Sequence, residues 1–516
     1  MFSPGRISGV LLPLFSLRSI DDAGIGDFGA LEGLFQWMNA ARQKILMLLP
    51  LLPTLPGDTS PYATRSAFGL NPVFIDLSKV PEFAESGGWS GLPDRERHYL
   101  DEARGSKRIR YDRVLALKGA ALQRAFTEFE RRDWKSGSDR AAALRRYQQE
   151  QGQWLEPFAL FCAISDARGN QAWWEWPDGL RTRNEAALAA ERERLWRDVL
   201  FHTWQQWIAE TQWQDVRKAA RGYGVFLCGD EPFIVGQDSV DTWSHPEILR
   251  RDARLGVPPD PFSATGQDWG LPYFDFTAME KEDFAWLKFR AERTAAYYDV
   301  RRVDHALGYF RQWIRDEKTP AGRFIPPDEP SQRAQGERLF RLLSASAGII
   351  AEDLGMVPDF VRETLPRLAI PGYRVLRWER DDGRYRDPQR FPKLSVVTTG
   401  THDTETLPEW WESLSDSERA AVAAVYSPLR GISELSSYSP AIHQALLASA
   451  EHAGSDLCIF PWQDVFASRE RINLPGSISQ SNWAYRIEQS VDQLLVSEAP
   501  RNAAALLARL SEDAGR

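Results

Sequence analysis

The chain is poor in the residues that build disulfide frameworks and zinc sites. Its 516 residues include three cysteines, Cys162, Cys228 and Cys458, too few and too scattered for a disulfide scaffold or a Cys-based zinc site. We therefore expect a protein of the reducing cytoplasm. The seven histidines show no metal-ligand spacing such as His-Glu-x-x-His. We expect neither a catalytic metal nor a cofactor built around one.

Long apolar runs and basic runs are also missing. Apolar residues nowhere continue for 18 positions, which argues against a membrane-spanning helix. The apolar stretch 7–17 could resemble the core of a secretory signal peptide. No small-residue cleavage site follows it, however, and charged residues come next, so we interpret it as a buried strand. Lys and Arg number 63 against 72 Asp and Glu, a formal net charge of −9, with no long basic run. Nucleic acid is therefore not an expected partner.

Eight short apolar runs recur along the chain, and segments of helical period separate most of them. Continuous apolar runs are typical of parallel strands that are buried on both faces. The runs are 9–17, 45–52, 224–235, 297–306, 348–355, 372–378, 394–403 and 457–466, with helices expected at 30–42, 281–298, 335–345 and 358–368. Eight is the number of strands in a (β/α)8 TIM barrel, so we predict that fold, of the α/β class.

The spacing of the runs predicts insertions into the barrel. About 170 residues separate the second and third runs, whereas a plain βα repeat takes roughly 30. The segment is rich in Arg, Glu, Ala and Trp with helical periods, so we predict a large, mainly helical insertion at residues 78–215 within one catalytic domain, 1–516. The Pro- and Gly-rich stretch 243–273 indicates a long loop, and we assign 236–280 to a loop insertion beside the binding groove.

Three carboxylates close three of the apolar runs. They are Asp304, Glu352 and Asp403. The carboxyl ends of the strands form the active face of such barrels, so all three are expected at one mouth. Structural alternatives exist: Asp304 could merely pair with Arg301 or Arg302, and Asp403 could cap the helix that begins near Thr404. Three carboxylates at one mouth favour a catalytic interpretation.

The surroundings of two of these carboxylates predict opposite protonation states. Arg302 lies two residues before Asp304, on the same face of the strand, and a nearby guanidinium lowers a carboxyl pKa, as an anionic nucleophile requires. Glu352 follows Ile349 and Ile350, and a dry environment raises a carboxyl pKa, as a general acid requires. One charged and one protonated carboxyl group is the arrangement of glycosidases.

Other catalytic classes have less support in the sequence. His305 and His402 adjoin two of the carboxylates, and we interpret them as donors to substrate hydroxyls. No Ser-His-Asp order and no phosphate-binding glycine loop accompany them. The segment Gly24-Ile25-Gly26-Asp27 lacks the third glycine of a dinucleotide fingerprint. Nucleotide chemistry is therefore not expected.

Ordered motifs run along nearly the whole chain. They are Gly24-Ile25-Gly26-Asp27, Ser60-Pro61-Tyr62, Ser66-Ala67-Phe68, Asn71-Pro72, Trp173-Trp174-Glu175-Trp176-Pro177, Gly229-Asp230, Asp238-Ser239, Gly256-Val257-Pro258-Pro259-Asp260, Thr265-Gly266-Gln267, Trp269-Gly270, Arg302-Val303-Asp304-His305, Ala351-Glu352-Asp353-Leu354-Gly355, Gly400-Thr401-His402-Asp403, Pro461-Trp462-Gln463-Asp464, Asn473-Leu474-Pro475-Gly476 and Asn482-Trp483. With these motifs the chain resembles the amylomaltases, or 4-alpha-glucanotransferases, of glycoside hydrolase family 77, which are barrel relatives of the alpha-amylases.

The resemblance implies a role for each carboxylate: Asp304 as the nucleophile, Glu352 as the general acid and base, and Asp403 as the residue that grips the sugar and stabilises the transition state. It implies no cofactor, and sugar contacts by Tyr62, Asp230, Trp269, Arg302, His305, His402 and Asn473. The expected reaction is a retaining transfer between alpha-1,4-glucans, either maltooligosaccharides or glucans derived from starch or glycogen. The sequence leaves the oligomeric state open.

Some positions depart from the family pattern. Ala306-Leu307 replaces a common Phe-Arg, and Pro261-Phe262 replaces a common Tyr-Phe in the loop that overhangs the glucan groove in relatives. We still expect Phe262 and Trp269 to border an acceptor site, with acceptor preference left open. The alternatives are an alpha-amylase-like retaining hydrolase and a non-catalytic glucan-binding barrel, which only the 20 tryptophans suggest.

Overall fold

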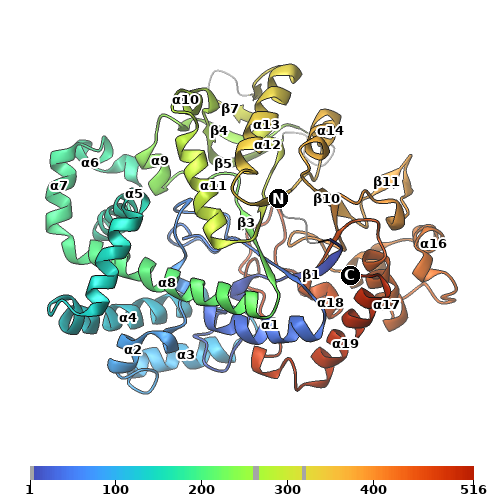
Figure 1. Cartoon of the computed structure of the whole chain (residues 1–516), viewed down its shortest axis with the longest axis horizontal. Coiled ribbons are helices and arrows are strands. Elements are labelled where there is room, and N and C mark those ends of the chain that lie inside the picture. The colour runs from blue at the N-terminus through green and yellow to red at the C-terminus, as the bar shows by residue number, and fades with distance from the viewer. Residues whose placement is uncertain (1–4, 260–265, 317–320) are drawn as a thin grey trace.

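The computed structural model describes residues 5–259, 266–316 and 321–516, and within them eight parallel strands close into a barrel (Figure 1). Their order around the barrel is β1-β14-β13-β10-β9-β6-β3-β2. The strands are β1 (Ile7–Leu11), β2 (Ile45–Leu48), β3 (Phe226–Glu231), β6 (Val300–Val303), β9 (Gly348–Ala351), β10 (Gly372–Val375), β13 (Ser395–Thr398) and β14 (Leu457–Pro461). Each overlaps one of the predicted apolar runs, and the predicted (β/α)8 barrel is confirmed.

The strands are shorter than the apolar runs that predicted them. The first run was expected to stay extended to Leu17, but β1 ends at Leu11 and Leu14–Ser16 form a 3-10 turn that is itself buried. Pro13 has no backbone N–H with which to continue the strand pairing. The apolar residues beyond the strand ends therefore pack into the loops of the carboxyl face.

Amphipathic helices cover the barrel. Helices α1 (Leu31–Ala40), α11 (Ala285–Tyr297), α13 (Glu329–Leu343) and α14 (Asp359–Arg367) lie where the sequence predicts helices, and α17 (Pro440–Glu451) and α19 (Glu498–Asp513) complete the carboxyl-terminal part. In α1, Leu31, Leu34, Phe35 and Met38 are buried, and their spacing places them along one face of the helix. That apolar face is part of the hydrophobic core.

Helices also fill the long segment between β2 and β3. They are α2 (Pro81–Glu85), α3 (Asp94–Gly105), α4 (Tyr111–Phe129), α5 (Asp139–Ala167), α6 (Asp178–Arg181), α7 (Glu185–Arg194) and α8 (Trp196–Gly222), and most lie on the left of Figure 1. Phe126, Phe201 and Trp204 pack in their interior, with ring centroids 5.3 to 6.4 Å apart. The boundaries 78–215 and the single domain 1–516 stay predictions.

The stretch after β3 contains a second sheet, so our interpretation of 243–273 as a loop was wrong for most of its length. Strands β4 (Leu249–Val257) and β5 (Gln267–Phe274) pair antiparallel and join β7 (Gln312–Arg315) and β8 (Arg323–Ile325) in the order β5-β4-β7-β8. The prolines and glycines of this stretch obscured the strand pattern of β4, in which buried and more exposed side chains alternate and Leu249, Ala253 and Leu255 are buried. The segment Asp260-Pro261-Phe262-Ser263 lies outside the described residues, and the extent 236–280 stays a prediction.

Candidate active site

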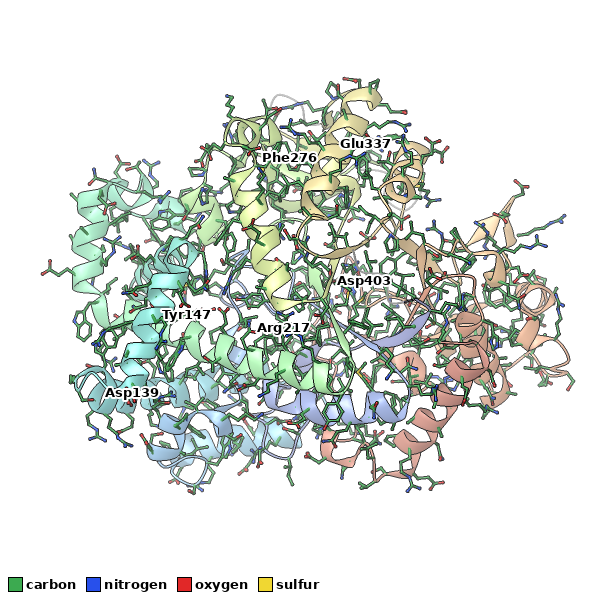
Figure 2. The ribbon with its side chains drawn as sticks, viewed as in Figure 1. Asp139, Tyr147, Arg217, Phe276, Glu337 and Asp403 are labelled. Atoms are coloured by element: carbon green, nitrogen blue, oxygen red, sulfur yellow. The ribbon has the colours of Figure 1, made fainter. Side chains whose placement is uncertain are left out.

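A cavity of about 260 Å³ lies at the carboxyl ends of the barrel strands. Figure 2 labels one of its carboxylates, Asp403, near the centre of the molecule. Its walls bring together predicted site residues from distant parts of the chain. The lining comprises Ser60, Tyr62, Pro232, Phe233, Ile234, Trp269, Leu271, Asp304, His305, His402, Asp403, Asn473 and Trp483.

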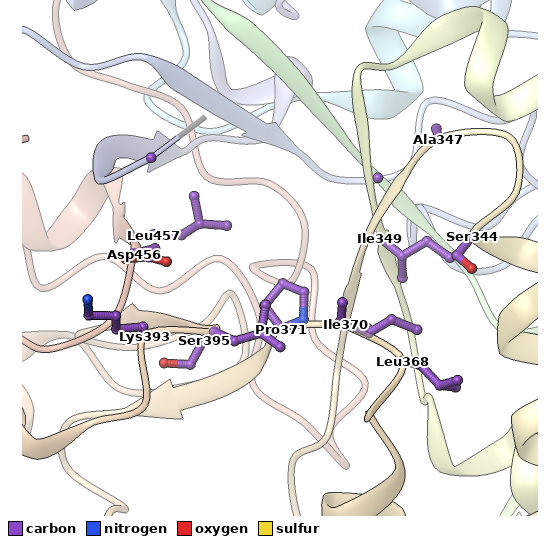
Figure 3. Close-up of a pocket in the computed structure, with 14 residues that line it drawn as sticks. Ser344, Ala347, Ile349, Leu368, Ile370, Pro371, Lys393, Ser395, Asp456 and Leu457 are labelled. Atoms are coloured by element: carbon purple, nitrogen blue, oxygen red, sulfur yellow. The ribbon is translucent and has the colours of Figure 1, made fainter. Parts of the chain in front are cut away.

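A second cavity, of about 270 Å³, lies at the opposite end of the barrel (Figure 3). It is lined by the amino ends of the strands, for example Ile349, Ser395 and Leu457, and by loop residues such as Pro371. The one carboxylate in its lining is Asp456. Because it lacks a carboxylate pair, we place the chemistry in the cavity at the carboxyl ends.

Arg302 connects the nucleophile candidate to a second carboxylate. Its Nη1 donates to Asp304 Oδ1 at 2.9 Å and to both carboxylate oxygens of Asp230 at 2.7 and 2.8 Å. Asp230 is the residue directly opposite Arg302 in the β3–β6 pairing. Burial alone would lower the pKa of Arg302, but the combined attraction of the acidic groups around it, Asp230 first among them and Asp304 included, raises the pKa well above its ordinary value. Asp304 therefore faces a permanent positive charge, as the sequence predicts.

Glu352 follows the next strand of the barrel, β9. Its Oε2 accepts from the backbone N–H of His305 at 2.9 Å, and its own N–H donates to the carbonyl of Val303 at 3.0 Å. Burial raises the pKa of Glu352 from 4.5 to about 7, against the opposing effect of Arg302. The predicted direction is confirmed, and a carboxyl group with this pKa exchanges protons near neutral pH.

Asp403 is held at the cavity by side chains from two loops. Asn473 donates to its Oδ1 at 2.7 Å, and His402 Nε2 lies 3.4 Å from Oδ2. Burial favours the neutral acid, yet His402 and Asn473 outweigh it and hold the pKa of Asp403 below its usual range. The helix-capping alternative is wrong, because Thr406 caps the following helix, α15 (Leu407–Ser413). Asp403 is thus an anionic acceptor facing the cavity.

Tyr62 connects His402, which contacts Asp403, to Asp230. Its hydroxyl donates to Asp230 Oδ2 at 2.6 Å and lies 3.1 Å from His402 Nε2, while the two rings stack with centroids 5.3 Å apart. Trp483 packs against both rings, at 5.7 and 5.9 Å. Trp483 was not predicted to contact the site; its signal in the sequence was the Asn482-Trp483 motif.

An aromatic wall stands on the other side of the cavity. Trp269 on β5 meets His305 edge to face at 4.9 Å, and Phe233 meets it at 5.5 Å. Burial lowers the pKa of His305 to about 4, so its ring is neutral at pH 7. Phe233 was missed as a cavity residue, although it lies only two residues after the carboxyl end of β3. The wall presents apolar faces beside hydrogen-bonding groups.

The described residues also bear on other classes of site. No group of three or more His, Cys, Asp or Glu side chains is arranged to hold a metal ion. In the same part of the chain, no helix combines the length and the apolar character that crossing a membrane requires.

Comparison with known proteins identifies the family. A family model described as 4-alpha-glucanotransferase, glycoside hydrolase family 77, matches residues 12–491. The 4-alpha-glucanotransferase of Synechocystis is 34% identical over 505 residues, covering 93% of this chain and 94% of the relative. That of Thermus thermophilus is 32% identical over 504 residues, covering 93% and 95%.

A solved structure agrees with these sequence matches. The amylomaltase of Streptococcus agalactiae, solved in complex with acarbose, superposes with a TM-score of 0.84 at 27% identity and covers 99% of both chains. The chain therefore belongs to the 4-alpha-glucanotransferase family, glycoside hydrolase family 77, and is a glycosyl-transferring enzyme.

Proposed function

We propose that the enzyme transfers alpha-1,4-glucan segments in this cavity by a retaining double displacement. Asp304 is the nucleophile, and Glu352 is the general acid and base. The observation that carries this proposal is the contrast between the two carboxyl groups. Asp304 contacts a charged guanidinium, whereas Glu352 has a pKa of about 7. A retaining enzyme needs this contrast, with the carboxyl groups about 5 to 5.5 Å apart. That separation stays a prediction.

In the first step, a carboxylate oxygen of Asp304 attacks the anomeric carbon of the donor. The bond from that carbon to the glycosidic oxygen breaks, and Glu352 gives its proton to the departing oxygen. In the second step, Glu352 takes the proton of an acceptor 4-hydroxyl, whose oxygen attacks the same carbon and releases Asp304. Two inversions restore the alpha configuration.

The remaining predicted residues bind the donor sugar. Asp403 is an anionic acceptor for sugar hydroxyls, and Asn473, already bonded to it, adds a donor beside it. His402 and Tyr62 offer further polar atoms at the same wall. The neutral ring of His305 can donate to a hydroxyl, and Trp269 beside it suits the apolar face of a glucose ring.

The proposal extends to the substrate and to the cellular location. We propose maltooligosaccharides and starch- or glycogen-derived glucans as substrates; the support is the family and the acarbose complex of the Streptococcus agalactiae relative. The net charge of −9 disfavours nucleic acid as a partner. The proposal of a cytoplasmic location rests on Cys162, Cys228 and Cys458, which are buried and unpaired.

The mechanism is tested by Asp304→Asn and Glu352→Gln, which keep the shape of each side chain. Each should lower kcat for maltotriose by more than about 10²-fold, because general acid and base catalysis alone contributes 10² to 10⁴-fold. A maltosyl fluoride donor needs little help from an acid, so it should restore much of the first step in Glu352→Gln and none in Asp304→Asn. Near wild-type turnover by either folded variant would overturn the assignment.

The balance between transfer and hydrolysis is tested with the wild-type enzyme. Transfer between maltotriose molecules releases glucose and builds longer chains while the number of reducing ends stays constant, whereas each hydrolysis adds one. Transfer should dominate, because a bound acceptor competes with water at a high effective concentration, on the order of 10⁵ M or more. If reducing ends rise in step with glucose and no longer product forms, the hydrolase alternative holds.

A further inference from the structure

The motif Pro461-Trp462-Gln463-Asp464 has no role in the mechanism proposed above. Asp464 lies on the short helix α18 (Trp462–Val465), which directly follows β14, and its side chain is buried. It is absent from the cavity lining. A buried carboxylate at the carboxyl end of a barrel strand, without a part in the chemistry, calls for a physical explanation.

The partners of the carboxylate supply one. Thr399 Oγ1 donates to Asp464 Oδ2 at 2.6 Å, and the backbone N–H of Leu407 donates to Oδ1 at 2.8 Å. Residues 399 and 407 are the two ends of the loop that follows β13, and this loop carries His402 and Asp403. In the described part of the chain, both hydrogen bonds that the carboxylate accepts come from this one loop.

Arg377 holds the same loop from the neighbouring strand. It lies two residues after β10, and its Nε donates to the carbonyl of Thr399 at 3.0 Å while its Nη1 donates to that of Glu405 at 2.7 Å. The guanidinium is almost fully buried. Arg377 and Asp464 therefore fix the loop at residues 399, 405 and 407 from two sides.

The fit around the loop leaves little room for an alternative path. A Cβ at Gly400 would lie 2.5 Å from Thr404 Oγ1, 3.3 Å from Arg377 Nη2 and 3.5 Å from Asp464 Oδ2. Asp464 is itself fixed, because His443 Nε2 lies 2.8 Å from its backbone carbonyl. The loop is thus hydrogen-bonded to two buried side chains, Asp464 and Arg377.

We propose that Asp464 and Arg377 are positioning residues that set His402 and Asp403 against the donor sugar. This inference rests on the proposed function, in which Asp403 grips that sugar. Displacing a catalytic group by about 1 Å can cost on the order of 10²-fold in rate. Loss of the hydrogen bonds beneath the loop should therefore appear in catalysis although neither residue lines the cavity.

The test compares Asp464→Ala, Asp464→Asn and Thr399→Val with wild type in kcat and KM for maltotriose. Asp464→Ala should lower kcat/KM by about 10²-fold. Asp464→Asn should lose less, because its amide oxygen still accepts from Leu407. Thr399→Val removes one hydrogen bond at constant shape, and it carries the test together with Asp464→Asn if the alanine variant fails to fold. Unchanged kcat/KM in these folded variants would overturn the proposal.

Glu451→Gln is the matched control. Glu451 is also a fully buried carboxylate, but it accepts from Ser8 Oγ and Ser511 Oγ, away from the cavity. Its substitution should lower the temperature of unfolding and leave kcat and KM unchanged. An equal catalytic loss in Glu451→Gln would mean that Asp464 supports the fold in general, and would overturn the positioning role.

A double-mutant cycle separates this inference from the function on which it rests. If Asp464 acts through Asp403, adding Asp464→Ala to Asp403→Asn should cost less than about tenfold more in kcat/KM, because coupled residues are not additive. A full additional loss would overturn the positioning role while leaving the proposed function intact. Full activity of Asp403→Asn alone would overturn the proposed function, and the inference with it.

Discussion

Two carboxylate–guanidinium pairs lie back to back on the same two strands, β3 and β6. Asp230 pairs with Arg302 at 2.7 Å, and Glu231, the residue after Asp230, pairs at 3.0 Å with Arg301, the residue before Arg302. Successive side chains of a strand point to opposite faces of the sheet. One pair therefore faces the barrel interior and the other faces the surrounding helices.

The two pairs differ in the groups that share their charge. Arg302 also binds Asp304, and Asp230 also accepts from Tyr62. In the outer pair, Glu231 Oε1 lies 3.3 Å from Nε of Arg290 on α11. All four residues of the two pairs are buried, and similar burial implies a similar cost of desolvation. Ion pairing and burial alone therefore do not identify a functional residue; hydrogen bonds to side chains that line the cavity, here Asp304 and Tyr62, do.

The largest expected difference between the pairs is in catalysis. Arg302→Met should lower kcat/KM for maltotriose by roughly 10³-fold, the upper range for removing one preorganised charged donor. The reason is that Asp304 loses the guanidinium that donates to its carboxylate at 2.9 Å. Arg301→Met serves as the control, with a loss below about tenfold. Comparable losses in the two variants would remove the distinction between inner and outer pair.

Stability should respond to the outer pair without the catalytic loss. Arg301→Met leaves Glu231 buried beside Arg290 alone, and breaking a buried pair typically costs about 3 to 5 kcal/mol of unfolding free energy. Urea unfolding measures this. Arg250, whose ion pair with Asp252 is exposed, provides the comparison: Arg250→Met should cost less than about 1 kcal/mol. Equal costs would contradict the role of burial.

The pH dependence of kcat/KM should report the titration of Glu352 and should not respond to loss of the outer pair. Glu352 must be protonated to act as an acid, and its pKa is about 7, so kcat/KM should fall about tenfold per pH unit above that value. Glu352→Gln should remove this limb, and Arg301→Met should leave its midpoint in place. A limb that persists in Glu352→Gln would assign the titration to another group.

The smallest effect concerns stability against pH. Because the folded pKa of Glu352 is raised above 4.5, the folded enzyme retains a proton that the unfolded chain releases. Its contribution to stability is present below pH 4.5 and is lost as pH rises towards 7. Unfolding midpoints across this range should fall slightly less steeply in Glu352→Gln than in wild type. An unchanged slope would mean that the group gains nothing by staying neutral.

The parts of the molecule that were predictable depend on contacts near in sequence. Apolar runs predicted all eight barrel strands, and Ile349-Ile350 before Glu352 predicted the dry environment that raises its pKa. Arg302 and Asp304 are two residues apart on one strand, so their contact followed from strand geometry.

The parts that were missed depend on long loops and on turn chemistry. Trp483 contacts Tyr62, about 420 residues away in the sequence, and no local sequence pattern predicts this contact. Asp464 belongs to a motif that the sequence shows, but its hydrogen-bond partners lie in the loop that follows another strand, β13. Proline and glycine between β4 and β5 indicated a loop, although the buried side chains of β4 decide the structure.

Barrel closure between β1 and β14 has a consequence for the newly made chain. Ile7 pairs with Leu457, so β1 acquires its second neighbour only after about 450 further residues have been added, roughly 20 to 90 s of synthesis at 5–20 residues per second. Throughout that interval β1 has an unpaired edge, the type of surface that promotes aggregation. Ribosome-bound intermediates of this enzyme should therefore depend on chaperones, and the yield of active protein should rise when chaperones are co-expressed.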